Sequence, residues 1–188
     1  MEKLVNPTKV ILGKDTLFSF VNLWTPKAVA EGSQAKYSLS CVIKKDSPDV
    51  AKVRAAIKAA YDEGQAKLKG NSKTVPPLEA LKTPLRDGDL ERPDDEAYAG
   101  CYFLNATSIQ PVGIVDRDCN PILDHSEVYS GVRGRVALQF YVFNNSGNRG
   151  IAVSVSNVQK WSDGPALGSK STPEEDFGGL DDDDEFLS

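Results

Sequence analysis

The fold of this chain is decided by residues 134–158, which read GRVALQFYVFNNSGNRGIAVSVSNV. Over residues 134–143 the side chains alternate between apolar and other types, as in a strand with one buried face. A second strand-like stretch, residues 150–158, follows after the turn-forming residues 144–149. This order predicts an antiparallel hairpin with a loop of several residues.

The segments before this hairpin add further strands and one helix. Residues 8–12 and 16–21 predict one strand or a bent pair, and residues 36–43 alternate with Tyr37, Leu39, Cys41 and Ile43 on one face. Residues 100–107 and 112–115 predict two more strands. From Pro48 to about Leu68, apolar residues recur at helical spacing behind a Ser-Pro-Asp start. A long irregular loop, rich in proline and charge, is expected over residues 70–99.

These elements predict a mainly β domain over residues 1–165. Five or six strands, one inserted helix and long loops favour a five-stranded Greek-key barrel of OB type. A β-sandwich with a helical insertion is the alternative architecture.

Length and composition fit one domain of ordinary size, with 188 residues of which 40% are apolar. The sequence has no apolar run of membrane-spanning length, and its first residues lack the apolar stretch of a signal peptide. Its three cysteines, Cys41, Cys101 and Cys119, are widely separated and odd in number. They indicate reduced thiols in a cytoplasmic protein rather than disulfides or a zinc site.

The charges are distributed unevenly, although the net charge is only −5. Residues 172–188 contain eight acidic residues and no lysine or arginine, which leaves the body with 19 acidic against 22 basic residues. We expect residues 166–188 to be a disordered acidic tail. Its end offers an acidic and aromatic docking segment: Asp181, Asp182, Asp183, Asp184, Glu185 and Phe186.

No catalytic constellation stands out, and we expect a non-enzymatic protein without cofactor or metal. The chain has a single histidine, so a multi-histidine centre is excluded. The stretch from Asp116 to Glu127 resembles a calcium loop, but Pro121 occupies the position that needs glycine. A nuclease that uses Asp116, Asp118 and Asp124 as metal ligands is a further alternative.

The second face of residues 134–143 mixes cations, an amide and aromatic rings, a combination that binds single-stranded nucleic acid. Each aromatic can equally be a core residue, and Trp24 can be a stacking platform or a barrel plug. The candidate nucleic-acid-binding residues are Trp24, Lys36, Phe103, Arg133, Arg135, Gln139, Tyr141, Phe143, Arg149, Lys160 and Trp161.

Several stretches resemble a phage single-stranded DNA-binding family first described as a domain of unknown function. They are residues 129–135 (YSGVRGR), 140–144 (FYVFN), 147–151 (GNRGI), 157–160 (NVQK) and 163–168 (DGPALG), with residues 6–8, 16–20 and 115–118 also similar. The resemblance implies an OB fold, sequence-tolerant binding of single-stranded DNA and a role in phage replication or recombination. It also implies that the acidic tail recruits replication and recombination proteins.

Two points stay open. A structural or assembly adaptor of a virion is the rival function, because the same β-body could hold protein instead of nucleic acid. A homodimer formed through edge strands is plausible.

Overall fold

The first strand, β1 (Lys9–Lys27), is long enough to belong to two parts of one sheet. Its first half pairs antiparallel with β6 (Arg133–Asn145), and its second half pairs antiparallel with β2 (Lys36–Lys44). The register shifts between Leu12 and Thr16, where Gly13-Lys14-Asp15 lie. The computed structural model, which describes residues 6–28 and 30–167, therefore has a single bent strand where the sequence left two possibilities open.

The remaining strands close a barrel. The strand β4 (Cys101–Ser108) pairs with β2, and β7 (Asn148–Ser162) pairs with β6. A parallel pairing of Thr107 with Ser154 joins β4 to β7. The barrel order is thus β1-β2-β4-β7-β6, with the short strands β3 (Arg86–Asp87) and β5 (Gly113–Val115) added outside it. The predicted five-stranded OB-type barrel is confirmed.

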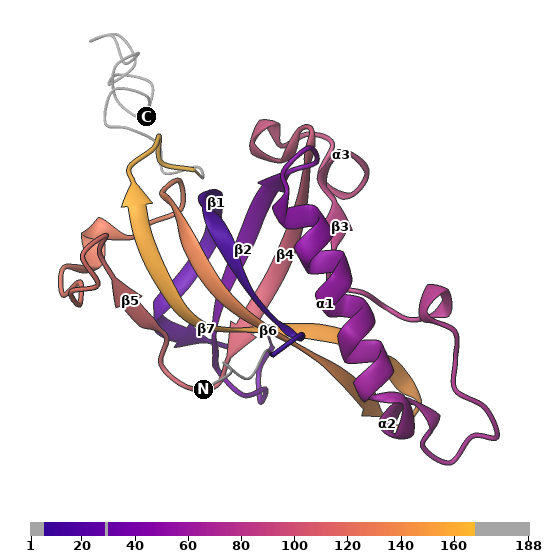
Figure 1. Cartoon of the computed structure of the whole chain (residues 1–188). Coiled ribbons are helices and arrows are strands. Elements are labelled where there is room, and N and C mark those ends of the chain that lie inside the picture. Colours follow the sequence, from indigo (N-terminus) through magenta and orange to yellow (C-terminus); the bar gives the residue numbers. More distant parts are fainter. Residues whose placement is uncertain (1–5, 29, 168–188) are drawn as a thin grey trace, which may run out of the picture.

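The predicted helix is divided into α1 (Asp49–Glu63) and α2 (Gln65–Lys69). The break falls at Gly64, where an added Cβ would collide with a methyl group of Val142. In Figure 1, α1 runs along the side of the barrel and α2 lies beside the far end of the β6–β7 hairpin. Among the described residues, no helix has the length and apolar character needed to cross a membrane.

The β6–β7 hairpin is tighter than the sequence predicted. Both strands continue to Asn145 and Asn148, so only Ser146 and Gly147 form the turn. Both turn residues have positive φ, +53° and +91°, as in the type I′ turn that suits the twist of a hairpin. The loop of several residues predicted for 144–149 is therefore wrong, because the strands take up most of it.

The region predicted as a long irregular loop contains the 3-10 turn η1 (Leu78–Ala80), the short helix α3 (Gly88–Glu91) and the 3-10 turn η2 (Glu96–Tyr98). We call Gly88–Ala99 the strap, because it lies over the outer face of β2 and β4. Tyr98 is fully buried there, edge-on to Phe103 with ring centroids 5.0 Å apart, and its hydroxyl donates to Ser40.

An ion pair network holds the start of the strap. The Lys45 ammonium lies 2.8 Å from the Asp87 carboxylate and 2.7 Å from that of Asp89. These hydrogen bonds raise the pKa of Lys45. The Asp89 carboxylate also accepts a hydrogen bond from the Gly100 backbone N–H at 2.9 Å, so both ends of the strap are tied to one point.

The three thiols lie in different environments, which predicts their reactivity. Cys41 is buried in the barrel, where burial raises its pKa to about 12, while Cys101 is half-buried and Cys119 is exposed. Because the thiolate is the reactive form, native protein should react with Ellman's reagent fast at Cys119 and slowly at Cys101. Cys41 should react only after unfolding. A Cys119→Ser variant should lose the fast phase, and a native protein with three fast thiols would contradict the barrel interior described here.

Candidate nucleic-acid interface

The outer face of β6 has the alternation that the sequence predicted. Val136, Leu138, Phe140 and Val142 are buried. On the opposite face, Arg135 is exposed and Tyr141 is 42% exposed, whereas Gln139 and Phe143 are half-buried. This face therefore presents a cation, an amide and an aromatic ring to solvent.

Strand pairing extends this face around the barrel. Six polar residues, one pairing with the next across neighbouring strands, form a line that we call the polar row: Asn22, Ser38, Thr107, Ser154, Gln139 and Lys9. Their neighbours along the strands, such as Leu39, Ala106 and Leu138, are buried core residues. The row therefore lies on the outer surface of all five barrel strands.

The polar row carries a single charge, that of Lys9, and its side chains are hydrogen-bonding groups. Asn22 donates to the Ser38 hydroxyl at 3.3 Å. The Gln139 amide accepts from Asn6 at 3.1 Å and donates to the Thr8 hydroxyl, so residues before β1 lie against that part of the row. Neutral donors and acceptors of this kind can contact a polar chain without demanding one sequence.

Exposed aromatic rings lie close to both ends of the row. Tyr141 follows Gln139 by two positions on β6. Phe20 precedes Asn22 by two positions on β1 and is 53% exposed. The guanidinium of Arg92, from the strap, lies 4.6 Å from the Phe20 ring centroid. The sequence alone did not indicate Phe20 or Arg92, because Phe20 falls within a predicted strand and Arg92 within the predicted irregular loop of residues 70–99.

Lys36 and Arg135 are exposed cations on strands that the row crosses. Lys36 begins β2, pairs with Lys27 and lies two positions before Ser38. Arg135 borders a shallow pocket of about 180 Å³ on the β1–β6–β7 surface, with Ile11 and Ala137 among its lining residues. Both predicted residues are therefore placed where a bound chain could reach them.

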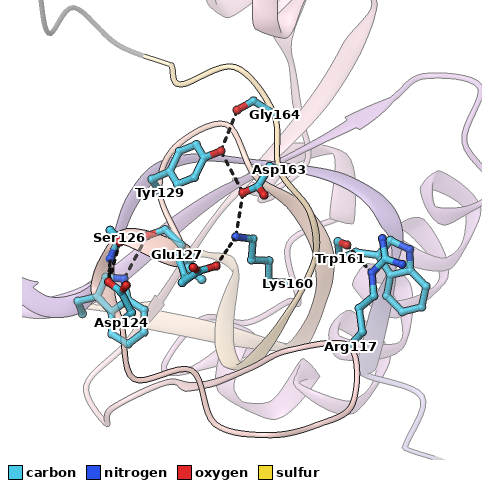
Figure 2. A network of polar contacts seen from close by, with 11 residues as sticks. Arg117, Asp124, Ser126, Glu127, Tyr129, Lys160, Trp161, Asp163 and Gly164 are labelled. Carbon is cyan, nitrogen blue, oxygen red and sulfur yellow. Dashed lines mark hydrogen bonds and ion pairs between the residues drawn. The ribbon is translucent and has the colours of Figure 1, made fainter.

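Lys160 is not a free cation, in contrast to its predicted role. Figure 2 shows its ammonium between two carboxylates, 2.9 Å from Glu127 and 2.8 Å from Asp163. Burial opposes the charge, but the hydrogen bonds to Asp163 and Glu127 leave its pKa raised. Because its charge is already matched, we do not include Lys160 in the interface.

Trp161 lies in a cationic setting at the end of β7. The Arg117 guanidinium is 4.7 Å from the ring centroid, and its Nε donates to the Trp161 carbonyl at 2.6 Å (Figure 2). Lys14 lies 5.8 Å from the same ring. The half-buried indole is thus held among cations that were not among the residues predicted from the sequence.

Phe103 and Trp24 are packed against other residues. Phe103 is only 2% exposed, because Tyr98 of the strap covers it, so the prediction of an accessible stacking ring is wrong. Trp24 is half-buried and stacks on His125 with centroids 4.3 Å apart, and its Nε1 donates to the Val128 carbonyl. Trp24 therefore already has an aromatic partner on one face.

The other predicted cations and Phe143 lie apart from the row. Arg133 donates to the Asp15 carbonyl at 2.9 Å and borders a separate pocket near the start of α1. Arg149 donates to the Ser72 hydroxyl at 2.5 Å, which ties the hairpin to the segment after α2. Phe143 packs over Gly150, where a Cβ would lie 2.9 Å from the ring.

The Asp116 and Asp124 carboxylates, which were considered as metal ligands, accept hydrogen bonds from backbone N–H groups of nearby turns. Asp116 accepts from the backbone N–H groups of Asp118 and Asn120, and Asp124 accepts from that of Ser126. Hydrogen bonds from Ser126 lower the pKa of Asp124. Among the residues that the structure describes, no group of three potential ligands is arranged to hold a metal ion.

Comparison with known proteins places the chain in a family. The family model described as "Enterobacter phage Enc34, ssDNA-binding protein" matches residues 8–187. The chain belongs to this family. A comparison with curated proteins found no match.

Solved structures of the Enc34 protein have the same fold. Its complex with ssDNA has a TM-score of 0.69 at 17% identity, covering 86% of this chain and 90% of the Enc34 chain. A C-terminal truncation of that protein has a TM-score of 0.64 at 19% identity, covering 85% and 88%. The gp2.5 single-stranded DNA-binding protein of bacteriophage T7 has a TM-score of 0.62 at 12% identity, covering 93% and 95%.

Proposed function

We propose that this chain binds single-stranded DNA without sequence preference and acts in phage DNA replication or recombination. Its membership of the Enc34 family supports this function. The observation that carries it is the polar row, which crosses all five barrel strands and has exposed Phe20 and Tyr141 close to its ends. The function is one of binding and includes no catalytic step.

The row suits a single strand for two physical reasons. OB folds bind oligonucleotides on the outer face of their second and third strands, which correspond here to β2 and β4. Aromatic rings stack on bases of any sequence, while lysine and arginine meet the phosphates. Lys9, Lys36 and Arg135 are exposed cations on the strands that carry the row.

We further propose that the acidic tail competes with DNA for this face and recruits replication or recombination proteins when displaced. The last described residue, Leu167, packs against the cluster formed by Leu17, Tyr98 and Phe103. Its N–H donates to the Ser130 carbonyl at 2.8 Å, and the Ser130 hydroxyl accepts from Val21. Residues 168–188, with Asp181 to Phe186, lie outside the described residues; Leu167, which precedes them, is held through Ser130 close to Val21, the neighbour of Phe20.

The test is fluorescence anisotropy of labelled oligo-dT with the full chain and with a chain that ends at Ser171. The shorter chain keeps every described residue and loses all eight tail carboxylates, so it should bind more tightly. Both should weaken with salt, with a slope of roughly −0.7 for each phosphate neutralised.

Each part of the proposal has its own contradicting result. Failure of both chains to bind at low salt would reject DNA binding and favour the assembly-adaptor alternative, in which an apolar protein interface hardly responds to salt. Equal affinity of the two chains would reject competition by the tail and leave DNA binding intact. Sedimentation of the full chain tests the homodimer that we propose for the edge strands.

A further inference from the structure

Phe20 has an unusual backbone conformation and an exposed ring. The packing of the core requires neither. It is a non-glycine residue with φ of +47° inside β1, at a register shift between Ser19 and Asn22. Positive φ in a bulky residue is unfavourable and persists where the surroundings impose it. Here Phe18 accepts a hydrogen bond from Gly131, and Val21 donates to Ser130. The backbone on both sides of Phe20 is thereby fixed, and its ring is turned out to solvent.

Arg92 lies on this ring. Its guanidinium is 4.6 Å from the Phe20 centroid, 5.1 Å from that of Tyr98 and 5.8 Å from that of Phe103. No carboxylate within the described part of the chain lies within ion-pair distance of it. The adjacent Glu91 pairs with Arg86, and Asp95 accepts from Ala97. Aromatic faces therefore hold this cation in place of a counter-ion.

The strap that carries Arg92 is held in place on both sides of this residue. Tyr98, six residues further on, is fully buried, and Lys45 ties the start of the strap to the β2–α1 connection. The arginine side chain itself is only half-buried. Its guanidinium can therefore adjust at the edge of the barrel while the strap stays in place.

We propose that Phe20 and Arg92 form a slot in which one nucleobase of the bound strand stacks on the Phe20 ring, on the face that the Arg92 guanidinium now covers. The inference rests on the proposed function and names residues of that binding face. A planar guanidinium on an aromatic ring has the geometry that a planar base adopts on the same ring. The occupant is a base and not a phosphate, because the remaining charges of the strap are acidic: Asp89, Glu91, Asp94, Asp95 and Glu96.

The decisive variant is Phe20→Gly in the full chain. Glycine adopts positive φ without strain, so the thermal midpoint should stay equal or rise while the ring is lost. Affinity for oligo-dT should fall by about 5- to 150-fold, the range expected for one stacked base. The salt slope should not change, because no phosphate contact is removed.

Two further variants complete the test. Arg92→Lys keeps the positive charge but removes the planar guanidinium group. It should weaken oligo-dT binding with an unchanged salt slope. Leu123→Ala, which truncates an 86% exposed apolar side chain, is the matched control and should bind as the unaltered chain does. Wild-type affinity of Phe20→Gly would overturn the slot while DNA binding stands. Absence of binding by the unaltered chain would instead overturn the proposed function, and the slot with it.

Discussion

Replacing Tyr98 with alanine is expected to lower the free energy of unfolding by about 3–5 kcal/mol, as for a large aromatic residue removed from a core. Tyr98 is fully buried although it belongs to a region that the sequence predicted as irregular. It joins Leu17, Val42 and Phe103 in a small apolar cluster on the outside of the barrel. Its removal leaves a cavity there and frees the strap.

Tyr98→Phe is the matched control for this effect. It keeps the ring and removes only the hydroxyl that donates to Ser40, so the cost should be about 0.5–1.5 kcal/mol. Urea unfolding followed by tryptophan fluorescence measures both variants. A cost below about 1 kcal/mol for Tyr98→Ala would mean that the strap is not part of the packed structure.

The strands were predictable because their alternation is local. The pattern of Tyr37, Leu39, Cys41 and Ile43 fixes which face of β2 points to the main core, and the same holds for Val136 to Val142 on β6. The OB-type order followed from strand count and from the resemblance of the C-terminal half to the phage family. The break at Gly64 and the two-residue turn at Ser146-Gly147 did not follow, because each depends on close packing or on φ.

The candidate site was only partly predictable, because the alternation of side chains along one strand does not show which residues of other strands lie beside it. Arg135, Gln139 and Tyr141 were correctly assigned to the face of β6 opposite the core. The burial of Phe103 depends on Tyr98, which is near in sequence but belongs to a segment predicted as irregular. The pairing of Lys160 depends on Asp163 in the chain segment after β7 and on the distant Glu127. The polar row depends on the register of five strand pairs, which no single-strand pattern contains.

The strap covers part of the outer face of β2 and β4, which is the face on which OB folds bind oligonucleotides. Phe103 and Ser40 lie on this face, but Tyr98 buries them and the strap adds acidic residues around them. Under the proposed function, we expect a DNA strand to pass beside the strap, along Ser38, Thr107 and Asn105, the β4 partner of Ser40, with Phe20 and Arg92 at its border. Leu167, the last described residue before the acidic segment, packs against the cluster that includes Tyr98 and Phe103 at the same border.

Reversing two charges beside the proposed path, Lys9→Glu with Lys36→Glu, is expected to weaken oligo-dT binding by about 10- to 100-fold at low salt. Lys9 belongs to the row and Lys36 lies two positions before Ser38; both are exposed, and neither forms an ion pair within the described residues. If each lysine neutralises one phosphate, the salt slope becomes shallower by roughly 0.7 for each phosphate that is no longer neutralised.

The matched control is Lys67→Glu with Lys69→Glu, which changes the net charge equally but on α2. Both helical lysines are exposed and lie outside the row, so this pair should lose little affinity beyond the long-range effect of net charge. Anisotropy titrations of both double variants at several salt concentrations separate local binding from general attraction. Equal losses of affinity and equal slopes in the two pairs would mean that DNA does not follow the polar row. A larger loss of affinity and a shallower slope in the Lys9 and Lys36 pair alone would place the phosphates on the outer face of β1 and β2.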